Sequence, residues 1–167
     1  MTQYALAVLN EMDQATFTAA LGDVFEHTPA IAQQVWPQRP FGSIAALHQA
    51  MVAVMLALPP AQQLDLICAH PELGLKATMT VTSGQEQARA GLDQLTPAIA
   101  ETLQKLNQTY RDRFQFPFIV AVKEHTPASI LAALHQRLTH DADTERQTAL
   151  AEIAKIAHYR LQALILP

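Results

Sequence analysis

Proline placement is the feature that most restricts how this chain folds. Four of its ten prolines directly follow a threonine or another proline, in the pairs Thr28-Pro29, Pro59-Pro60, Thr96-Pro97 and Thr126-Pro127. Threonine is a good helix N-cap, and proline suits the first turn of a helix because its missing N–H would have no partner there. The pairs therefore indicate where helices begin.

Apolar residues spaced three and four apart predict a series of helices. These helices start near Asp13 and after Ser43, and then cover 60–69, 83–95, 97–113, 127–139 and about 144–164. The run 114–122 breaks the pattern because it is nearly all apolar, with β-branched and aromatic members. A sheet is not expected, since Pro117 lacks a ladder donor and only 78–82 offers a partner strand. The sequence predicts an all-α fold, a single-domain helical bundle with one extended apolar segment at about 114–122.

Size and charge restrict the class of protein. A chain of 167 residues, half of them hydrophobic, fits one domain spanning 1–167. The net charge is −4 and no basic block occurs, which argues against a nucleic-acid partner. One cysteine cannot form an internal disulfide, and no apolar run is long enough for a membrane span. The N-terminus has no positive region ahead of an apolar run, so a signal peptide is not expected. A cytoplasmic location without membrane contact is expected.

His70 is the first candidate for chemistry. It ends the helix over 60–69 because the following Pro71 disfavours helical geometry at the residue before it. An imidazole has an ordinary pKa near 6.5, which suits proton transfer at neutral pH. The alternative is a histidine that only interacts with the carbonyl end of its helix. The spacing leaves both interpretations open.

Ser83 and Glu86 fit the pattern Ser-x-x-Glu. The structural interpretation is a capping box, in which the two side chains bind each other's backbone N–H groups. The functional interpretation is that Ser83, Glu86 and Gln87 crowd the positive end of a helix, which suits a polar or anionic ligand. Spacing alone favours the cap.

Two arginines interrupt apolar stripes. Arg160 lies near the centre of the face formed by Ala149, Ile153, Ile156, Ala157 and Leu164. Because an unpaired buried charge is very costly, Arg160 is expected to have an ordered partner in the protein or in a ligand. Arg137 lies only at the margin of its stripe and is the weaker candidate for an arginine with such a partner.

The extended segment raises a related question about hydrogen bonds. If 116–122 is buried without a sheet partner, its amides need a polar ligand, helix-like turns or side-chain partners. Metal-ligand spacings, phosphate loops and nucleophile elbows do not occur in the sequence.

Several motifs, taken in order, resemble a known family. They are His70-Pro71-Glu72-Leu73, Ser83-Gly84-Gln85-Glu86-Gln87, Ala90-Gly91-Leu92, Leu106-Asn107 with Tyr110, and Phe114-Gln115-Phe116-Pro117-Phe118-Ile119, with Arg39-Pro40-Phe41, Lys155-Ile156 and Arg160-Leu161 nearer the ends. The chain is similar to the 2-oxo-4-hydroxy-4-carboxy-5-ureidoimidazoline (OHCU) decarboxylases, enzymes of urate breakdown. The resemblance departs at 122–125, where glycine is commoner in the family.

The resemblance implies a fold, a reaction and a set of roles. It implies an all-α homodimer that uses no metal and no organic cofactor, and that converts OHCU to (S)-allantoin and CO2. The catalytic histidine and glutamate correspond to His70 and Glu86. The substrate-binding positions correspond to Pro71, Ser83, Gln87, the backbone clamp Phe118, Ile119 and Val120, and the closing Arg160. The alternatives are a non-catalytic helical binding or interaction module and a hydrolase that uses the same histidine and glutamate.

Overall fold

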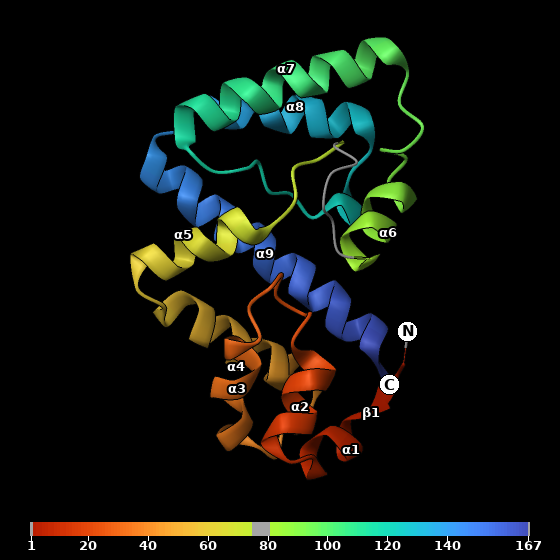
Figure 1. The fold of residues 1–167 in the computed structure, drawn as a ribbon, viewed down its shortest axis with the longest axis vertical. Helices are drawn as coiled ribbons and strands as arrows, with labels where there is room; N and C mark the ends of the chain where they lie inside the picture. The colour runs from red at the N-terminus through yellow and green to blue at the C-terminus, as the bar shows by residue number, and fades with distance from the viewer. Residues whose placement is uncertain (1, 75–80, 167) are drawn as a thin grey trace. The chain divides into compact units, whose positions relative to one another are not determined.

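Helices make up nearly all of the regular structure, which confirms the all-α prediction (Figure 1). The computed structural model describes residues 2–74 and 81–166. In chain order these contain β1 (Tyr4–Ala5), α1 (Leu6–Glu11), α2 (Gln14–Leu21), α3 (Ala30–Val35), η1 (Trp36–Gln38), α4 (Ile44–Ala57), α5 (Pro60–Ala69), α6 (Val81–Arg89), α7 (Pro97–Phe114), η2 (Val122–Glu124), α8 (Pro127–Arg137), α9 (Ala142–Leu164) and β2 (Ile165–Leu166). The short helix α1 was not predicted, and only the start of α3 was indicated, by Thr28-Pro29, because six residues hold too little periodicity to detect.

Five of the described helices begin at side-chain caps, and one of them is α9, where Asp141 accepts a hydrogen bond from the Thr144 N–H at 2.8 Å. Asp13, Ser43, Thr96 and Thr126 each accept a hydrogen bond from the N–H three residues further on, at the starts of α2, α4, α7 and α8. The cap satisfies a backbone donor that has no partner within the helix. The starts predicted from Ser43, Thr96 and Thr126 are therefore confirmed.

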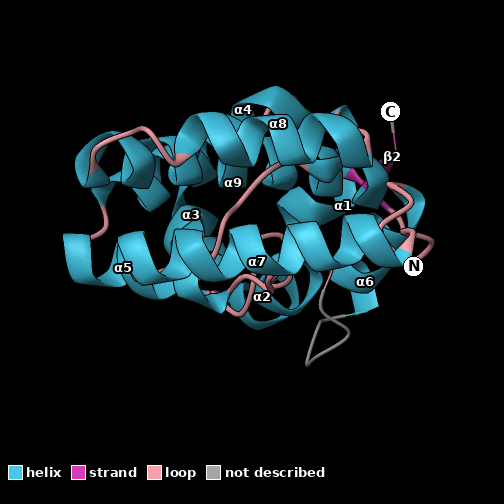
Figure 2. Ribbon diagram, turned by 90° about the horizontal axis from the view of Figure 1, so that it is seen from above, coloured by secondary structure: helices cyan, strands magenta, loops and turns pink. Residues whose placement is uncertain are grey.

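The strands are minimal. β1 pairs with β2 in parallel, with Tyr4 opposite Ile165, and the pair is the small magenta element in Figure 2. The strand partner considered at 78–82 is not described over 78–80, whereas Val81 and Thr82 open α6. Among the described residues, no single helix is long and apolar enough to cross a membrane; α4 and α5 pass that test only together, across a bend of 118°.

The chain forms two compact units. The first holds 1–66 and 154–167, and the second holds 67–153, so α5 and α9 each contribute to both. The prediction that 1–167 folds as one domain stays a prediction. In the first unit α2 packs on α3 and α3 packs on α4. Its core includes Phe17, Leu21, Ile31, Leu47, Met51 and Leu161.

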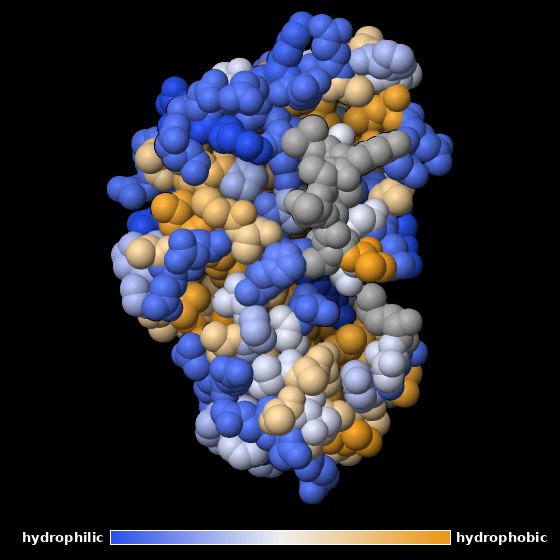
Figure 3. Space-filling view, in the orientation of Figure 1, coloured by the Kyte–Doolittle hydropathy of each residue, from blue (hydrophilic) through white to orange (hydrophobic). Residues whose placement is uncertain are grey.

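In the second unit α7 packs along α8. The buried residues of α7 are Leu103, Asn107, Tyr110 and Phe114, which share one face, while the opposite surface of this helix is hydrophilic (Figure 3). Gln115 ends α7 in the left-handed conformation, at φ 63°. The chain then continues without regular structure to η2, and Phe118, Ile119, Val120 and Ala121 are all buried. Of the predicted extended apolar segment at 114–122, residues 115–121 lie outside regular structure, whereas Phe114 belongs to α7 and Val122 begins η2.

Candidate active site

The turn that follows α5 carries His70, which is buried at 6% exposure. The backbone N–H of His70 bonds to the carbonyl of Ile67 at 3.2 Å, so the residue stays attached to the end of α5. Pro71 and Glu72 follow and are half-buried. Because Pro71 ends the helix there, the chain direction changes at the residue proposed for proton transfer.

Two amide side chains hold the rest of this turn. Gln87 accepts a hydrogen bond from the Gly74 N–H at 3.0 Å and donates one to the Glu72 carbonyl at 3.4 Å. Asn107 donates to the Leu73 carbonyl at 2.9 Å. These bonds attach the segment after His70 to α6 and α7. The side chain of Glu72 forms an ion pair with Arg111.

Ser83 and Gln87 lie four residues apart on one face of α6 and are both buried, whereas Glu86 is half-buried. The prediction that Ser83 caps this helix is wrong, because α6 already includes Val81 and Ser83 is a residue within it. Ser-x-x-Glu describes a capping box only when the serine precedes the first turn. Ser83 is therefore a buried polar side chain within the helix.

Helix α6 ends earlier than predicted, at Arg89 instead of Leu95. Gly91 adopts φ +76°, and the N–H groups of Gly91 and Leu92 bond to the carbonyls of Ala88 and Gln87. This pair of bonds is a Schellman motif, which closes a helix at a left-handed residue. The apolar spacing continues past Gly91, and for that reason the prediction extended too far.

Charged side chains satisfy part of the buried segment that contains the predicted clamp. Arg137 donates through Nη1 to the Ile119 carbonyl at 2.5 Å. The Ala121 N–H donates to the Glu152 carboxylate at 2.8 Å. Of the three ways considered for satisfying these amides, side-chain partners are found at both positions. The Arg137 guanidinium also lies 4.5 Å from the centre of the Phe118 ring.

Arg137 belongs to a buried polar cluster around Glu145, which has no exposed surface. Arg137 Nε donates to Glu145 Oε1 at 2.7 Å, and His140 Nδ1 lies 2.8 Å from Oε2. Tyr110 donates its hydroxyl hydrogen to the same carboxylate. Burial, followed by the bond to Glu145, raises the pKa of Tyr110 far above its ordinary value, so the hydroxyl remains a donor.

Arg160 belongs to the first unit and has ordered partners, as its place in an apolar stripe predicts. Its Nη1 lies 2.9 Å from the Glu26 carboxylate and 3.1 Å from the Asp23 carbonyl. Arg160 and Glu26 are buried, at 7% and 1% exposure. The role of Arg160 in binding substrate stays a prediction.

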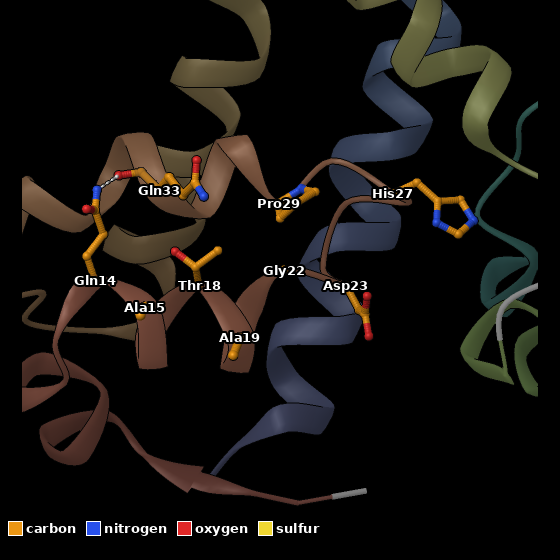
Figure 4. A pocket seen from close by; sticks show the side chains of 9 residues that line it. All are labelled: Gln14, Ala15, Thr18, Ala19, Gly22, Asp23, His27, Pro29 and Gln33. Carbon is orange, nitrogen blue, oxygen red and sulfur yellow. Dashed lines mark hydrogen bonds between the residues drawn. The ribbon is translucent and has the colours of Figure 1, made fainter.

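A surface groove of about 700 Å³ occurs in the first unit (Figure 4). Its lining comes from α2, α3 and the loop between them: Gln14, Ala15, Thr18, Ala19, Gly22, Asp23, His27, Pro29 and Gln33. The ring of His27 points away from the other labelled side chains. None of the predicted site residues lines this groove. Within 2–74 and 81–166, no group of three or more histidine, cysteine or acidic side chains is arranged to hold a metal ion.

Several buried polar residues are not among those predicted from the sequence. Asn107 and Glu152 contact the two segments described above, Glu145 binds the Arg137 side chain, and Glu26 pairs with Arg160. A signal was present for three of them. Asn107 follows Leu103 by four positions on the stripe of α7, while Glu145 and Glu152 flank Ala149 by four and three on α9. A polar side chain on an apolar stripe needs an ordered partner at these positions as it does at Arg160, whereas Glu26 lies in a loop without periodicity.

Comparison with known proteins identifies the class. The family model for OHCU decarboxylase matches residues 10–162, so this chain belongs to the OHCU decarboxylase family and is a carboxy-lyase. A relative from Halalkalicoccus jeotgali named 2-oxo-4-hydroxy-4-carboxy-5-ureidoimidazoline decarboxylase is 46% identical, over 100% of this chain and 95% of its own.

Two further proteins support the assignment. A uric acid degradation bifunctional protein from Bacillus subtilis is 46% identical over 94% of this chain, which spans 32% of that longer protein. The crystal structure of an (S)-allantoin synthase superposes with a TM-score of 0.80 at 31% identity, over 96% of this chain and 54% of that one. The predicted family is confirmed.

Proposed function

We propose that this chain converts OHCU to (S)-allantoin and CO2 in urate degradation, with His70 as the proton carrier. The observation that carries the proposal is the match to the OHCU decarboxylase family over nearly the full chain. The buried histidine at the end of α5, in a turn held by Gln87, supports it.

In this reaction the protein has to orient the substrate and to transfer protons. The bond from the ring carbon to the carboxylate breaks and releases CO2. Its electron pair forms a carbon–carbon double bond, while the adjacent C=N bond accepts electrons at nitrogen and then a proton. The resulting enol loses its hydroxyl proton and gains one at carbon, which gives allantoin. Because the substrate supplies this electron sink, catalysis depends on orientation and on proton donors and acceptors.

His70 is assigned the proton transfers, and Glu86 orients its ring. A carboxylate that holds one imidazole nitrogen selects the tautomer presented to substrate. Pro71 shapes the pocket beside the histidine by ending α5. Delivery of the proton to one face of the planar intermediate would make the product a single enantiomer.

The polar groups of the substrate are assigned to three sets of donors. Ser83 and Gln87 share the buried face of α6. The backbone of Phe118, Ile119 and Val120 provides N–H groups, and Arg160 provides a cation for an oxygen anion. The amide of Gln87 bonds to Gly74 and Glu72, so it also positions the segment next to His70.

The test uses fresh OHCU, generated enzymatically from urate. Addition of the purified chain should accelerate the optical decay, release CO2 and yield (S)-allantoin, as measured by circular dichroism. Decay at the spontaneous rate with racemic product would refute the proposal and would instead fit a non-catalytic binding module. Faster loss of OHCU without CO2 release would indicate hydrolysis.

We also propose that the protein is a cytoplasmic homodimer. The family resemblance supports the dimer, and the single cysteine, Cys68, fits a reducing compartment because it can form no disulfide within the chain. Sedimentation equilibrium tests the first point: a mass of one chain across the micromolar range would refute it. Fractionation of the source cells tests the second.

A further inference from the structure

Two buried charged side chains bind the backbone of the clamp and of the residue that follows it. Arg137 of α8 binds the Ile119 carbonyl at 2.5 Å, and Glu152 of α9 binds the Ala121 N–H at 2.8 Å. Both side chains are buried, at 6% and 9% exposure. These two contacts determine the orientation of two consecutive peptide groups, those on either side of Val120.

The first contact has a direct geometric consequence. A trans peptide group is planar, and its C=O and N–H bonds point in opposite directions. The Ile119 carbonyl points at the Arg137 guanidinium, so the Val120 N–H points away from Arg137. A rotation of this peptide group would break the bond to Arg137 and turn the Val120 N–H toward the buried cluster.

We propose that Arg137 is a positioning residue that orients the Val120 N–H toward the substrate. The inference rests on the proposed function, in which this N–H is one of the clamp donors. Arg137 acts through the backbone and need not touch the substrate. Arginine suits the task because its planar guanidinium presents several donors in fixed directions.

The contacts of the guanidinium show why it holds a single orientation. Its Nε donates to Glu145 at 2.7 Å and Nη2 lies 2.5 Å from the same oxygen, while Nη1 is directed at Ile119. Its face lies over the ring of Phe118. Glu145 is in turn held by Tyr110 and His140. The cluster therefore fixes the orientation of the peptide group between Ile119 and Val120 from the side of its carbonyl.

The principal test is Arg137→Lys. A lysine keeps a positive charge beside Glu145, but its single ammonium group on a flexible chain cannot reproduce the fork that reaches Glu145 and Ile119 together. We expect KM for OHCU to rise about tenfold while kcat changes less than threefold, because substrate and transition state lose the same oriented donor. A KM equal to that of the wild type in the folded variant overturns the inference.

A second variant guards against a folding defect. Arg137→Met with Glu145→Gln removes both buried charges together, which protein cores tolerate better than loss of one partner. The same rise in KM is expected, and a KM like that of the wild type contradicts the positioning role. The matched control is Thr96→Ala, which weakens the N-cap of α7 without touching the clamp and should leave KM unchanged while stability falls.

The outcomes separate this inference from the proposed function. A wild-type chain that does not accelerate OHCU decay refutes both. An active wild-type chain with two folded variants of unchanged KM refutes the positioning role alone. A fall in kcat with unchanged KM also contradicts it, since that result would place Arg137 in the chemical step.

Discussion

The Arg160 guanidinium lies 2.9 Å from the carboxylate of Glu26, although the two residues are 134 positions apart in the chain. Both side chains are buried, so this ion pair joins α9 to the loop between α2 and α3 within the first unit. A charge in the interior is stable when an opposite charge and hydrogen bonds compensate for its lost hydration. The pair is therefore a structural feature of its unit, whatever Arg160 contributes to substrate binding.

Removal of the cation should be costly. Arg160→Met is expected to lower the free energy of unfolding by roughly 3–5 kcal/mol, because Glu26 loses its buried counter-charge. Arg160→Met with Glu26→Gln should be less destabilised, and urea unfolding of all forms measures the difference. Equal losses in the single and double variants would argue against coupling. Lys105→Met serves as the control, since the Lys105–Glu101 pair is exposed and contributes little.

His70→Asn tests the proton carrier. The amide keeps a polar side chain of similar size but cannot transfer protons near neutral pH, so kcat should fall about 10²–10⁴-fold. Circular dichroism and thermal unfolding check that the variant folds. Turnover near that of the wild type would remove His70 from the mechanism.

Glu86→Gln tests the orienting carboxylate. Because Ser83 is not the N-cap of α6, Glu86 has no capping-box role, and its loss should not unwind the helix. We expect kcat to fall at least about tenfold, with the free energy of unfolding changed by under about 0.5 kcal/mol. Steady-state kinetics and urea unfolding measure the two quantities. A large loss of stability with kcat preserved would give Glu86 a structural role instead.

The turn after His70 depends on glycine at position 74. Gly74 has φ +75°, and an added Cβ would lie 2.8 Å from Leu103 Cδ2. Gly74→Ala should therefore destabilise the protein by about 1–3 kcal/mol, through backbone strain and the contact. Gly91→Ala has the same strain in open space and should cost less. Gly84→Ala, in α6 with no atom within 4 Å of the added Cβ, should be neutral or stabilising. Urea unfolding ranks the three variants by their free energy of unfolding. An equal loss of stability at positions 74 and 91 would contradict the contact with Leu103.

Tyr110 makes stability depend on pH in the alkaline range. Its folded-state pKa is raised above the ordinary value of 10.0, chiefly by burial. The corresponding stability is fully present below pH 10 and is lost as the pH rises above 10, because the unfolded chain then releases a proton that the folded chain retains. Tyr110→Phe should be less stable at pH 8 but should lose less stability between pH 9 and 11. Urea unfolding at these values measures the slopes, and parallel slopes would contradict this assignment.

Local signals in the sequence predict much of the fold and part of the site. The caps at Ser43, Thr96 and Thr126 are where predicted, since capping depends on residues three apart. Signals of the same kind are misleading at two other positions. Ser83 matches a cap pattern yet lies inside α6, and Arg137, judged marginal on its stripe, is buried against Glu145. A helical wheel reports which face a residue occupies but not what packs against that face.

The amino-acid sequence by itself determined the starts of α2, α4, α5, α7 and α8, most of the buried faces, the break after α7 and the resemblance to one enzyme family. Tertiary structure decided which distant polar groups meet: Arg160 with Glu26, Gln87 with Gly74, and Arg137 with the Ile119 carbonyl. The physical reason is the distance along the chain over which each kind of interaction acts. Helix propensity and capping act over a few neighbouring residues, whereas the partner of a buried charge is chosen by whichever segment the packed core places within hydrogen-bonding distance.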